Sequence, residues 1–286
     1  MIDFEQMKRD IQTLNLNLYD FALYTDQGLK QHKFQKCNTC NNSYSIGKAF
    51  VMTAIGLLCD DGLVHVEDRL SVVMNDLFPP VTDDGWKIAT VEQALTHHLG
   101  FASDFLDIDV DDVTSYPTDD YLSLVLSHPL EYLPGTHYAY SDAAFYLLAR
   151  LVEHVSGKTL DAFLYERLLS PMHFHEIAWS RCPHGHPIGA TGMYASAADI
   201  VKLGWLYLNG GVFEGRHLLS AKWVKRVLTR EYELHMMTPN GLIGKGGMYG
   251  QGLVLSKEGR FAVSWHGYEG GAGIERLIDY LDSLHR

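Results

Sequence analysis

A strongly apolar stretch near the N-terminus predicts a buried helix. Residues 49–59 (AFVMTAIGLLC) are apolar on every helical face except at Thr53. A helix that is hydrophobic all round belongs in a protein core rather than at its surface. Asn42 or Ser43 can cap the start of this helix, and Gly62 can end it.

The rest of the chain shows strand patterns near both ends and helical patterns between them. The first residues form an amphipathic helix with Phe4, Met7 and Ile11 on one face. We predict strands at 17–24, 29–36, 249–255 and 261–265, and helices at 91–97, 119–127, 145–155 and 274–284. Asp26-Gln27-Gly28 joins the first two strands as a hairpin, and Thr90 with Gln93 makes a capping box. We therefore expect one sheet that is built from segments near the two ends of the chain.

This order of elements predicts an α/β (α+β) fold with an antiparallel sheet, flanking terminal helices and an all-helical lobe. We expect one domain, 1–286, of two lobes: residues 1–62 and 195–286 form the α/β lobe, and residues 63–194 the mainly helical lobe. There is no internal repeat and no low-complexity linker.

Composition narrows the functional classes. The chain has 286 residues, 47% hydrophobic and 20% charged, as in an ordinary globular protein. Its 23 Lys and Arg against 35 Asp and Glu give a net charge of −12, which argues against a nucleic-acid or anionic-membrane partner. The N-terminus does not resemble a secretory signal, so we expect a cytoplasmic protein. The four cysteines are too few for a disulfide scaffold, and we expect reduced thiols.

The start of the apolar helix carries candidate nucleophilic chemistry. Ser45 and Lys48 are three residues apart, which on a helix puts their Cβ atoms roughly 5–6 Å apart on one face. Burial would lower the pKa of Lys48, so that its free amine could take the proton of Ser45. The N–H groups at the helix start would stabilise an oxyanion beside Ser45.

Several separated segments match one family in order. The S-x-x-K of 45–48 is followed by 60–68 (DDGLVHVED), 95–100 (LTHHLG), 134–142 (PGTHYAYSD), 192–199 (GMYASAAD), 208–211 (LNGG) and 265–267 (WHG). Over residues 28–271 the chain resembles the serine β-lactamase and penicillin-binding-protein superfamily, in its class C β-lactamase-like branch of peptidases and esterases. The last of these segments is similar to the Lys/His-x-Gly strand of that family.

The resemblance implies catalytic and substrate-binding residues. Ser45 would attack an acyl carbonyl, Lys48 would keep its hydroxyl deprotonated or hydrogen-bonded, and Tyr140 would shuttle a proton to the leaving group. The N–H of Ser45 and one from the strand after His266 would form the oxyanion hole. His266 would donate to a substrate carboxylate or to Tyr140; the alternative is a strand-end histidine satisfied by backbone. Tyr140 has an alternative role as a core aromatic. Gly267 and Tyr268 would line the substrate site.

The chain departs from the family pattern in three places. Asp142 replaces the Asn that donates to a substrate amide, and an ionised carboxylate only accepts hydrogen bonds and repels anionic substrates. Tyr268 stands where the strand motif has a glycine, and its side chain could narrow the substrate site. The sequence ends soon after Gly273, whereas the family has further strands before its terminal helix.

Other clusters have weaker metal-binding or redox interpretations. Asp107, Asp109, Asp111 and Asp112 lack the glycine and glutamate of a calcium loop, and we expect a solvated acidic loop. The group of His173, His175, Cys182, His184 and His186 has zinc-type ligands without a standard spacing. Cys37 and Cys40 form a single C-x-x-C without a thioredoxin-like context. We expect no metal and no cofactor.

Together these observations predict a serine hydrolase that works through an acyl-enzyme on a small-molecule substrate. An esterase or small-amide hydrolase is the first candidate, because cell-wall peptidases and β-lactamases act outside the membrane. A β-lactamase or D-alanyl-D-alanine carboxypeptidase-like activity is the second. A non-hydrolytic descendant that binds a ligand or partner is a third, from another class, although it would not need Ser45, Lys48 and Tyr140 together.

Overall fold

The computed structural model describes residues 2–79 and 83–284, and the chain falls into two compact units. The first unit comprises Met1–Ile46, Ser170–Ala178 and Tyr194–Arg286, and the second comprises Gly47–Leu169 and Trp179–Met193. The lobes expected from the sequence, 1–62 with 195–286 and 63–194, stay a prediction, and in this division the apolar helix groups with the helical unit. That the two units make one catalytic domain stays a prediction, and residues 1, 80–82 and 285–286 of the expected lobes lie outside the described residues.

A six-stranded antiparallel sheet forms the centre of the first unit. Its strand order is β2-β1-β11-β10-β9-β8. The bounds are β1 Leu18–Thr25, β2 Gly28–Lys33, β8 His235–Met236, β9 Leu242–Gly247, β10 Gln251–Ser256 and β11 Phe261–Gly267. The last strand therefore pairs with the first, which brings together segments that are more than two hundred residues apart in sequence, such as Asp20 and His266.

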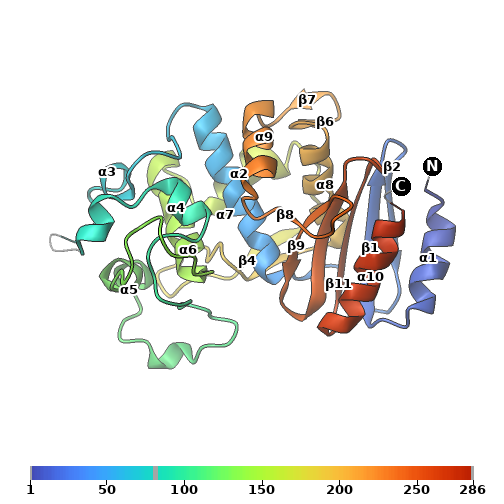
Figure 1. Cartoon of the computed structure of the whole chain (residues 1–286), viewed down its shortest axis with the longest axis horizontal. Helices are drawn as coiled ribbons and strands as arrows, with labels where there is room; N and C mark the ends of the chain where they lie inside the picture. The colour runs from blue at the N-terminus through green and yellow to red at the C-terminus, as the bar shows by residue number, and fades with distance from the viewer. Residues whose placement is uncertain (1, 80–82, 285–286) are drawn as a thin grey trace. The chain divides into compact units, whose positions relative to one another are not determined.

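Helices cover both faces of this sheet (Figure 1). The terminal helices α1 (Phe4–Thr13) and α10 (Gly271–Ser283) pack against one face and share a buried core with β1, β9, β10 and β11. Phe4, Met7 and Ile11 point into that core, as the sequence predicts. Helix α8 (Ala197–Leu208) packs on the opposite face against β1, β10 and β11.

The first unit also holds several short elements. They are η1 (Tyr44–Ile46), η5 (Met248–Gly250), α9 (Ala221–Arg230), β3 (Asn41–Asn42), β6 (Val212–Phe213) and β7 (Arg216–His217), with β4 (Ile177–Trp179) and β5 (Met193–Ala195) at the unit boundary. β3 pairs with β5 through Asn41 and Ala195. This pairing anchors the chain just before η1, the turn that contains Ser45.

The second unit is helical. Its elements are α2 (Gly47–Asp60), α3 (Leu70–Val73), η2 (Asp84–Lys87), α4 (Val91–Leu95), η3 (Val113–Ser115), α5 (Tyr121–Ser127), α6 (Asp142–Ser156), α7 (Leu160–Leu164) and the π-helical turn η4 (Tyr165–Leu169). Helix α2 is buried from Gly47 to Leu58 and packs against α6 and α7, as its all-apolar sequence predicts. The predicted Thr90–Gln93 capping box is present at α4.

The fold is the expected one, with an antiparallel sheet, flanking terminal helices and a helical region. The sequence patterns did not identify α8, α9 or β9. Within residues 2–79 and 83–284, no helix is both long and apolar enough to cross a membrane. The cytoplasmic location stays a prediction.

Candidate active site

Ser45 lies in the middle of η1, a three-residue 3-10 turn that leads directly into α2. The turn is closed by the N–H of Ile46, which donates to Ser43 O at 3.1 Å. Tyr44 has a left-handed φ of 48°, and its N–H donates to Asn42 Oδ1 at 3.0 Å. Asn42 therefore caps this turn, and Ser45 remains partly exposed while the helix behind it is buried.

The strand of the sheet beside this turn is β9, and β10 also contacts η1. A Cβ atom at Gly247 would lie 2.5 Å from Ser43 O, so only glycine permits this close approach of β9 to the serine segment. β9 contains Lys245-Gly246-Gly247, which also fits a Lys-x-Gly pattern. Two strands, β10 and β11, and then α10 follow β9, whereas only α10 follows the 265–267 segment, as the sequence indicates.

The sequence match at residues 265–267 falls on β11, which lies between β1 and β10. His266 is fully buried there. Its Nδ1 lies 3.0 Å from Asp20 Oδ1, and its Nε2 lies 3.1 Å from Ser43 Oγ. Both ring nitrogens thus have side-chain partners, whereas the alternative interpretation expected backbone partners. No atom of His266 is exposed to a substrate, so its burial does not support the predicted role in substrate binding.

The backbone N–H groups after His266 also have partners within the first unit. Those of Gly267, Tyr268 and Glu269 donate to Gln251 Oε1, Asn17 O and Tyr249 O, each at 3.0 Å. An oxyanion donor from this segment would have to break one of these bonds. Tyr268 is 58% exposed, and its ring stacks on that of Tyr249 at a centroid distance of 4.8 Å.

In the helical unit, Lys48 lies in the first turn of α2 and is fully buried. Its Nζ is 2.6 Å from Asp142 Oδ1 and donates to Ala190 O at 3.0 Å. The same Nζ lies 4.7 Å from the ring centroid of Tyr140. The predicted residues Lys48, Tyr140 and Asp142 are therefore brought together. The adjacent carboxylate favours the ammonium form of Lys48, which opposes the effect of burial on this side chain.

Tyr140 and Asp142 are positioned by the start of α6. Ser141 is the N-cap residue, and its hydroxyl accepts the N–H of Ala144 at 3.3 Å. The N–H of Ser141 donates to Nδ1 of His97 at 3.0 Å, and the His97 ring packs on Tyr140 at a centroid distance of 4.4 Å. His97 comes from the LTHHLG segment, so that segment orients Tyr140.

Further carboxylates surround Asp142. Asp104 Oδ1 accepts the N–H of Asp142 at 2.8 Å, and burial of that carboxylate, together with the charge of Asp142, raises the pKa of Asp104 to about 6. The pKa values of Asp107 and Asp109 are also raised, chiefly by burial. One oxygen from each of Asp107, Asp109 and Asp142 lies within 4.8 Å of the others. Since Lys48 already supplies a positive charge to Asp142, this acidic cluster alone does not define a metal site.

Two of the remaining histidine candidates pair with carboxylates of their own. His175 pairs with Asp199 and His186 with Glu153, so these two histidines have separate carboxylate partners. Burial raises the pKa of the Cys37 thiol, and burial with the charge of Glu176 raises that of Cys40 to about 11. Both thiols are free and, with raised pKa values, are poor nucleophiles at neutral pH.

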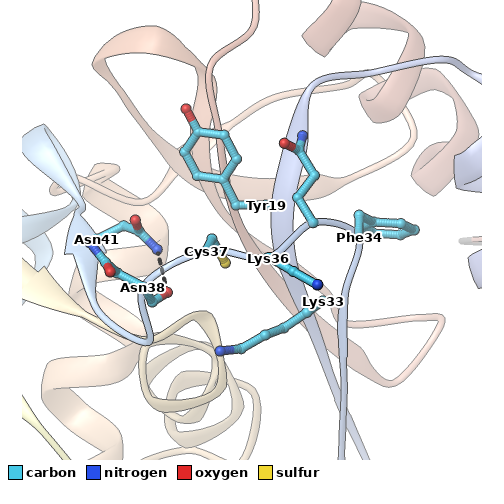
Figure 2. Close-up of a pocket in the computed structure, with 8 residues that line it drawn as sticks. Tyr19, Lys33, Phe34, Lys36, Cys37, Asn38 and Asn41 are labelled. Atoms are coloured by element: carbon cyan, nitrogen blue, oxygen red, sulfur yellow. Dashed lines mark hydrogen bonds between the residues drawn. The ribbon is translucent and has the colours of Figure 1, made fainter.

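A pocket in the first unit lies beside β2 and contains none of the predicted site residues (Figure 2). It is lined by Tyr19, Lys33, Phe34, Gln35, Lys36, Cys37, Asn38 and Asn41. Asn41 Nδ2 donates to Asn38 O at 3.3 Å across part of it. This mixed lining of lysines, amides, two aromatic rings and a thiol indicates no particular ligand by itself.

Comparison with known proteins identifies the family to which this fold belongs. The profile of the family named Beta-lactamase matches residues 30–280. The chain belongs to the beta-lactamase family.

Individual relatives are distant. The "Putative D-alanyl-D-alanine carboxypeptidase" of Escherichia coli (strain K12) is 24% identical over 273 residues, which cover 75% of this chain and 60% of that protein. The chain thus spans less than two thirds of that relative's length. The fold is similar to that of the "Putative 6-aminohexanoate-dimer hydrolase from Bacillus anthracis", with a TM-score of 0.81 and 16% identity over 99% of this chain and 82% of that one. A family VIII carboxylesterase gives a TM-score of 0.72 with 18% identity over 97% and 96% of the two chains.

Proposed function

We propose that Ser45 is the nucleophile of an acyl-enzyme mechanism that hydrolyses a small ester or amide. Ser45 Oγ would bond to the substrate carbonyl carbon, the carbonyl oxygen would become an oxyanion, and the alcohol or amine would leave with a proton. Water would then release the acyl group by the same steps. The observation that carries this proposal is the buried, charge-paired Lys48 three residues after a partly exposed serine.

Lys48 and Tyr140 have different roles in this proposal: Lys48 stabilises negative charge and Tyr140 transfers a proton. The carboxylate of Asp142, 2.6 Å from Lys48 Nζ, favours an ammonium that lowers the energy of the developing serine alkoxide. Tyr140, whose ring lies 4.7 Å from that ammonium, would transfer the proton of Ser45 to the leaving group. Asp142 then supports Lys48 rather than contacting substrate, a different role from the substrate-binding one implied by the resemblance.

The charge around Lys48 favours neutral or cationic substrates. Asp104, Asp107, Asp109 and Asp142 are close together in the helical unit, and an anionic acyl or leaving group would be repelled by them. An esterase or small-amide hydrolase is consistent with this charge, and two structural neighbours are named as a 6-aminohexanoate-dimer hydrolase and a family VIII carboxylesterase.

A D-alanyl-D-alanine carboxypeptidase-like or β-lactamase activity is the second candidate. It is favoured by the sequence relatives, which are named as a D-alanyl-D-alanine carboxypeptidase and a penicillin-binding protein. The acidic surroundings of Lys48 speak against it, because substrates of both activities carry a carboxylate.

The test is reaction with matched acylating reagents. Wild type and Ser45→Ala are incubated separately with a penicillin, an activated ester and a fluorophosphonate, and each product is measured by intact mass. We expect an adduct with the ester and the fluorophosphonate only in wild type. An adduct with penicillin alone would favour the second candidate, and equal labelling of folded Ser45→Ala would refute Ser45 as the nucleophile.

A further inference from the structure

Three buried polar side chains of the sheet unit form a hydrogen-bonded chain that ends two residues before Ser45. His266 joins Asp20 at 3.0 Å and Ser43 at 3.1 Å. Ser43 and His266 are fully buried, and Asp20 is 7% exposed. The order of groups is that of a Ser–His–Asp triad, in which a carboxylate orients an imidazole that accepts from a hydroxyl. However, the burial of Ser43 keeps substrate away from its hydroxyl.

Asp20 fixes which ring nitrogen of His266 bears hydrogen. Asp20 Oδ2 also accepts the N–H of Ala197, at 3.3 Å, and an ionised carboxylate only accepts hydrogen bonds. The tautomer with hydrogen on Nδ1 is therefore the one that bonds to Asp20. Nε2 then has a lone pair and accepts the hydroxyl hydrogen of Ser43, for which the other acceptor, Asn41 O, is farther away at 3.4 Å.

Ser43 in turn fixes the turn that contains Ser45. Its carbonyl oxygen accepts the N–H of Ile46 at 3.1 Å and faces Gly247 of β9. Its side chain is tied to β11 through His266. The residue between Ser43 and Ser45 is Tyr44, whose left-handed φ of 48° is unfavourable for a bulky residue and is maintained by the surrounding contacts. The position of Ser43 thus sets the start of η1.

We propose that Asp20, His266 and Ser43 form a positioning relay that orients the η1 turn and thereby sets the rate at which Ser45 is acylated. None of the three side chains touches substrate. The inference rests on the proposed function, because it needs Ser45 as the nucleophile. It gives His266 a role different from substrate binding and explains why a serine is buried at position 43.

Removing one bond of the relay should affect the rate of acylation more than binding. A nucleophile displaced by a fraction of an ångström to about 1 Å can lose about 10- to 100-fold in rate. We expect Ser43→Ala to lower the maximal acylation rate by about that factor and to leave the half-saturating ester concentration nearly unchanged. His266→Gln, which places an amide oxygen near the Nε2 position, should retain more activity than His266→Asn, which reaches only the Nδ1 position.

The matched control is Ser264→Ala. Ser264 is also a fully buried serine, on β11 two residues before His266, and its hydroxyl donates to Gly252 O at 2.8 Å. The Ser264→Ala variant therefore loses a comparable buried hydrogen bond but keeps the hydrogen bonds among Asp20, His266 and Ser43. The four variants and wild type are compared by stopped-flow acylation with an activated ester, by thermal unfolding, and by ¹⁵N NMR of the His266 ring in wild type.

The inference predicts a slowed Ser43→Ala, a Ser264→Ala at the wild-type rate, and an Nδ1–H tautomer of His266. It is overturned if folded Ser43→Ala reacts at the wild-type rate, if the NMR shows an Nε2–H tautomer or an imidazolium at neutral pH, or if peptide mapping finds the acyl group on Ser43 itself. If wild type takes no adduct at all, the proposed function fails, and the NMR tautomer alone decides whether the relay exists.

Discussion

Replacing Asp142 with Asn would leave the buried ammonium of Lys48 without its carboxylate at 2.6 Å. The asparagine is nearly the same size, so the change removes charge rather than packing. Lys48 is fully buried and Asp142 is 4% exposed, so solvent cannot replace the lost carboxylate. The neutral backbone acceptor Ala190 O remains, and the carboxylates of Asp104 and Asp109 still interact electrostatically with Lys48.

The expected loss of stability follows from this burial. Removing one partner of a buried ion pair costs about 3–5 kcal/mol, because the other charge stays in a medium of low dielectric constant.

The assay is urea unfolding of wild type and Asp142→Asn at several pH values. Asp84→Asn is the control, since it removes the carboxylate of a solvent-exposed ion pair, with Lys87, and should change stability little. A deficit of less than about 1 kcal/mol for Asp142→Asn at pH 7 would refute the view that Asp142 stabilises the ammonium of Lys48.

Two further changes test other parts of the account. The pKa of Asp104 is raised to about 6 in the folded protein, so the folded state binds more protons than the unfolded chain between about pH 4 and 6. The free energy of unfolding should therefore fall as the pH rises through this window. Asp104→Asn should flatten this dependence when unfolding is measured at several pH values, and an unchanged curve would contradict the raised pKa of Asp104. Gly247→Ala places a Cβ 2.5 Å from Ser43 O and should slow acylation about 10-fold or more. The Cβ of Gly246→Ala meets only Gln251 O, at 3.9 Å, so this variant should be slowed less. Equal acylation rates for the two variants would contradict the close approach of β9 to Ser43.

Local patterns predicted much of the fold. The apolar run from Ala49 to Cys59 needs burial on all sides, and the Thr90–Gln93 capping box depends only on residues three apart, so both were predictable from sequence. The hairpin of β1 and β2 likewise needed only alternation and a turn. β9 was not identified, because Gly244, Gly246 and Gly247 interrupt its apolar pattern, although a Lys-x-Gly followed by two more strands and a helix was a usable signal.

The contacts that could not be predicted from the sequence join residues far apart along the chain. His266 and Ser43 are 223 residues apart, and nothing near either residue indicates that they bond. The Lys/His-x-Gly pattern fits both β9 and β11, and only the strand order identifies the strand beside η1. The resemblance implies a substrate-binding role for Asp142 from its chain position alone, whereas its contact with Lys48 depends on the packing of α6 against α2.

The most direct test of the central claim is peptide-mapped mass spectrometry of the protein after brief reaction with a fluorophosphonate, run beside Ser45→Ala. The account predicts one adduct, on the peptide that contains Ser45, and none on the folded variant. An adduct on another residue, or the same labelling in Ser45→Ala, would contradict the assignment of Ser45 as the nucleophile.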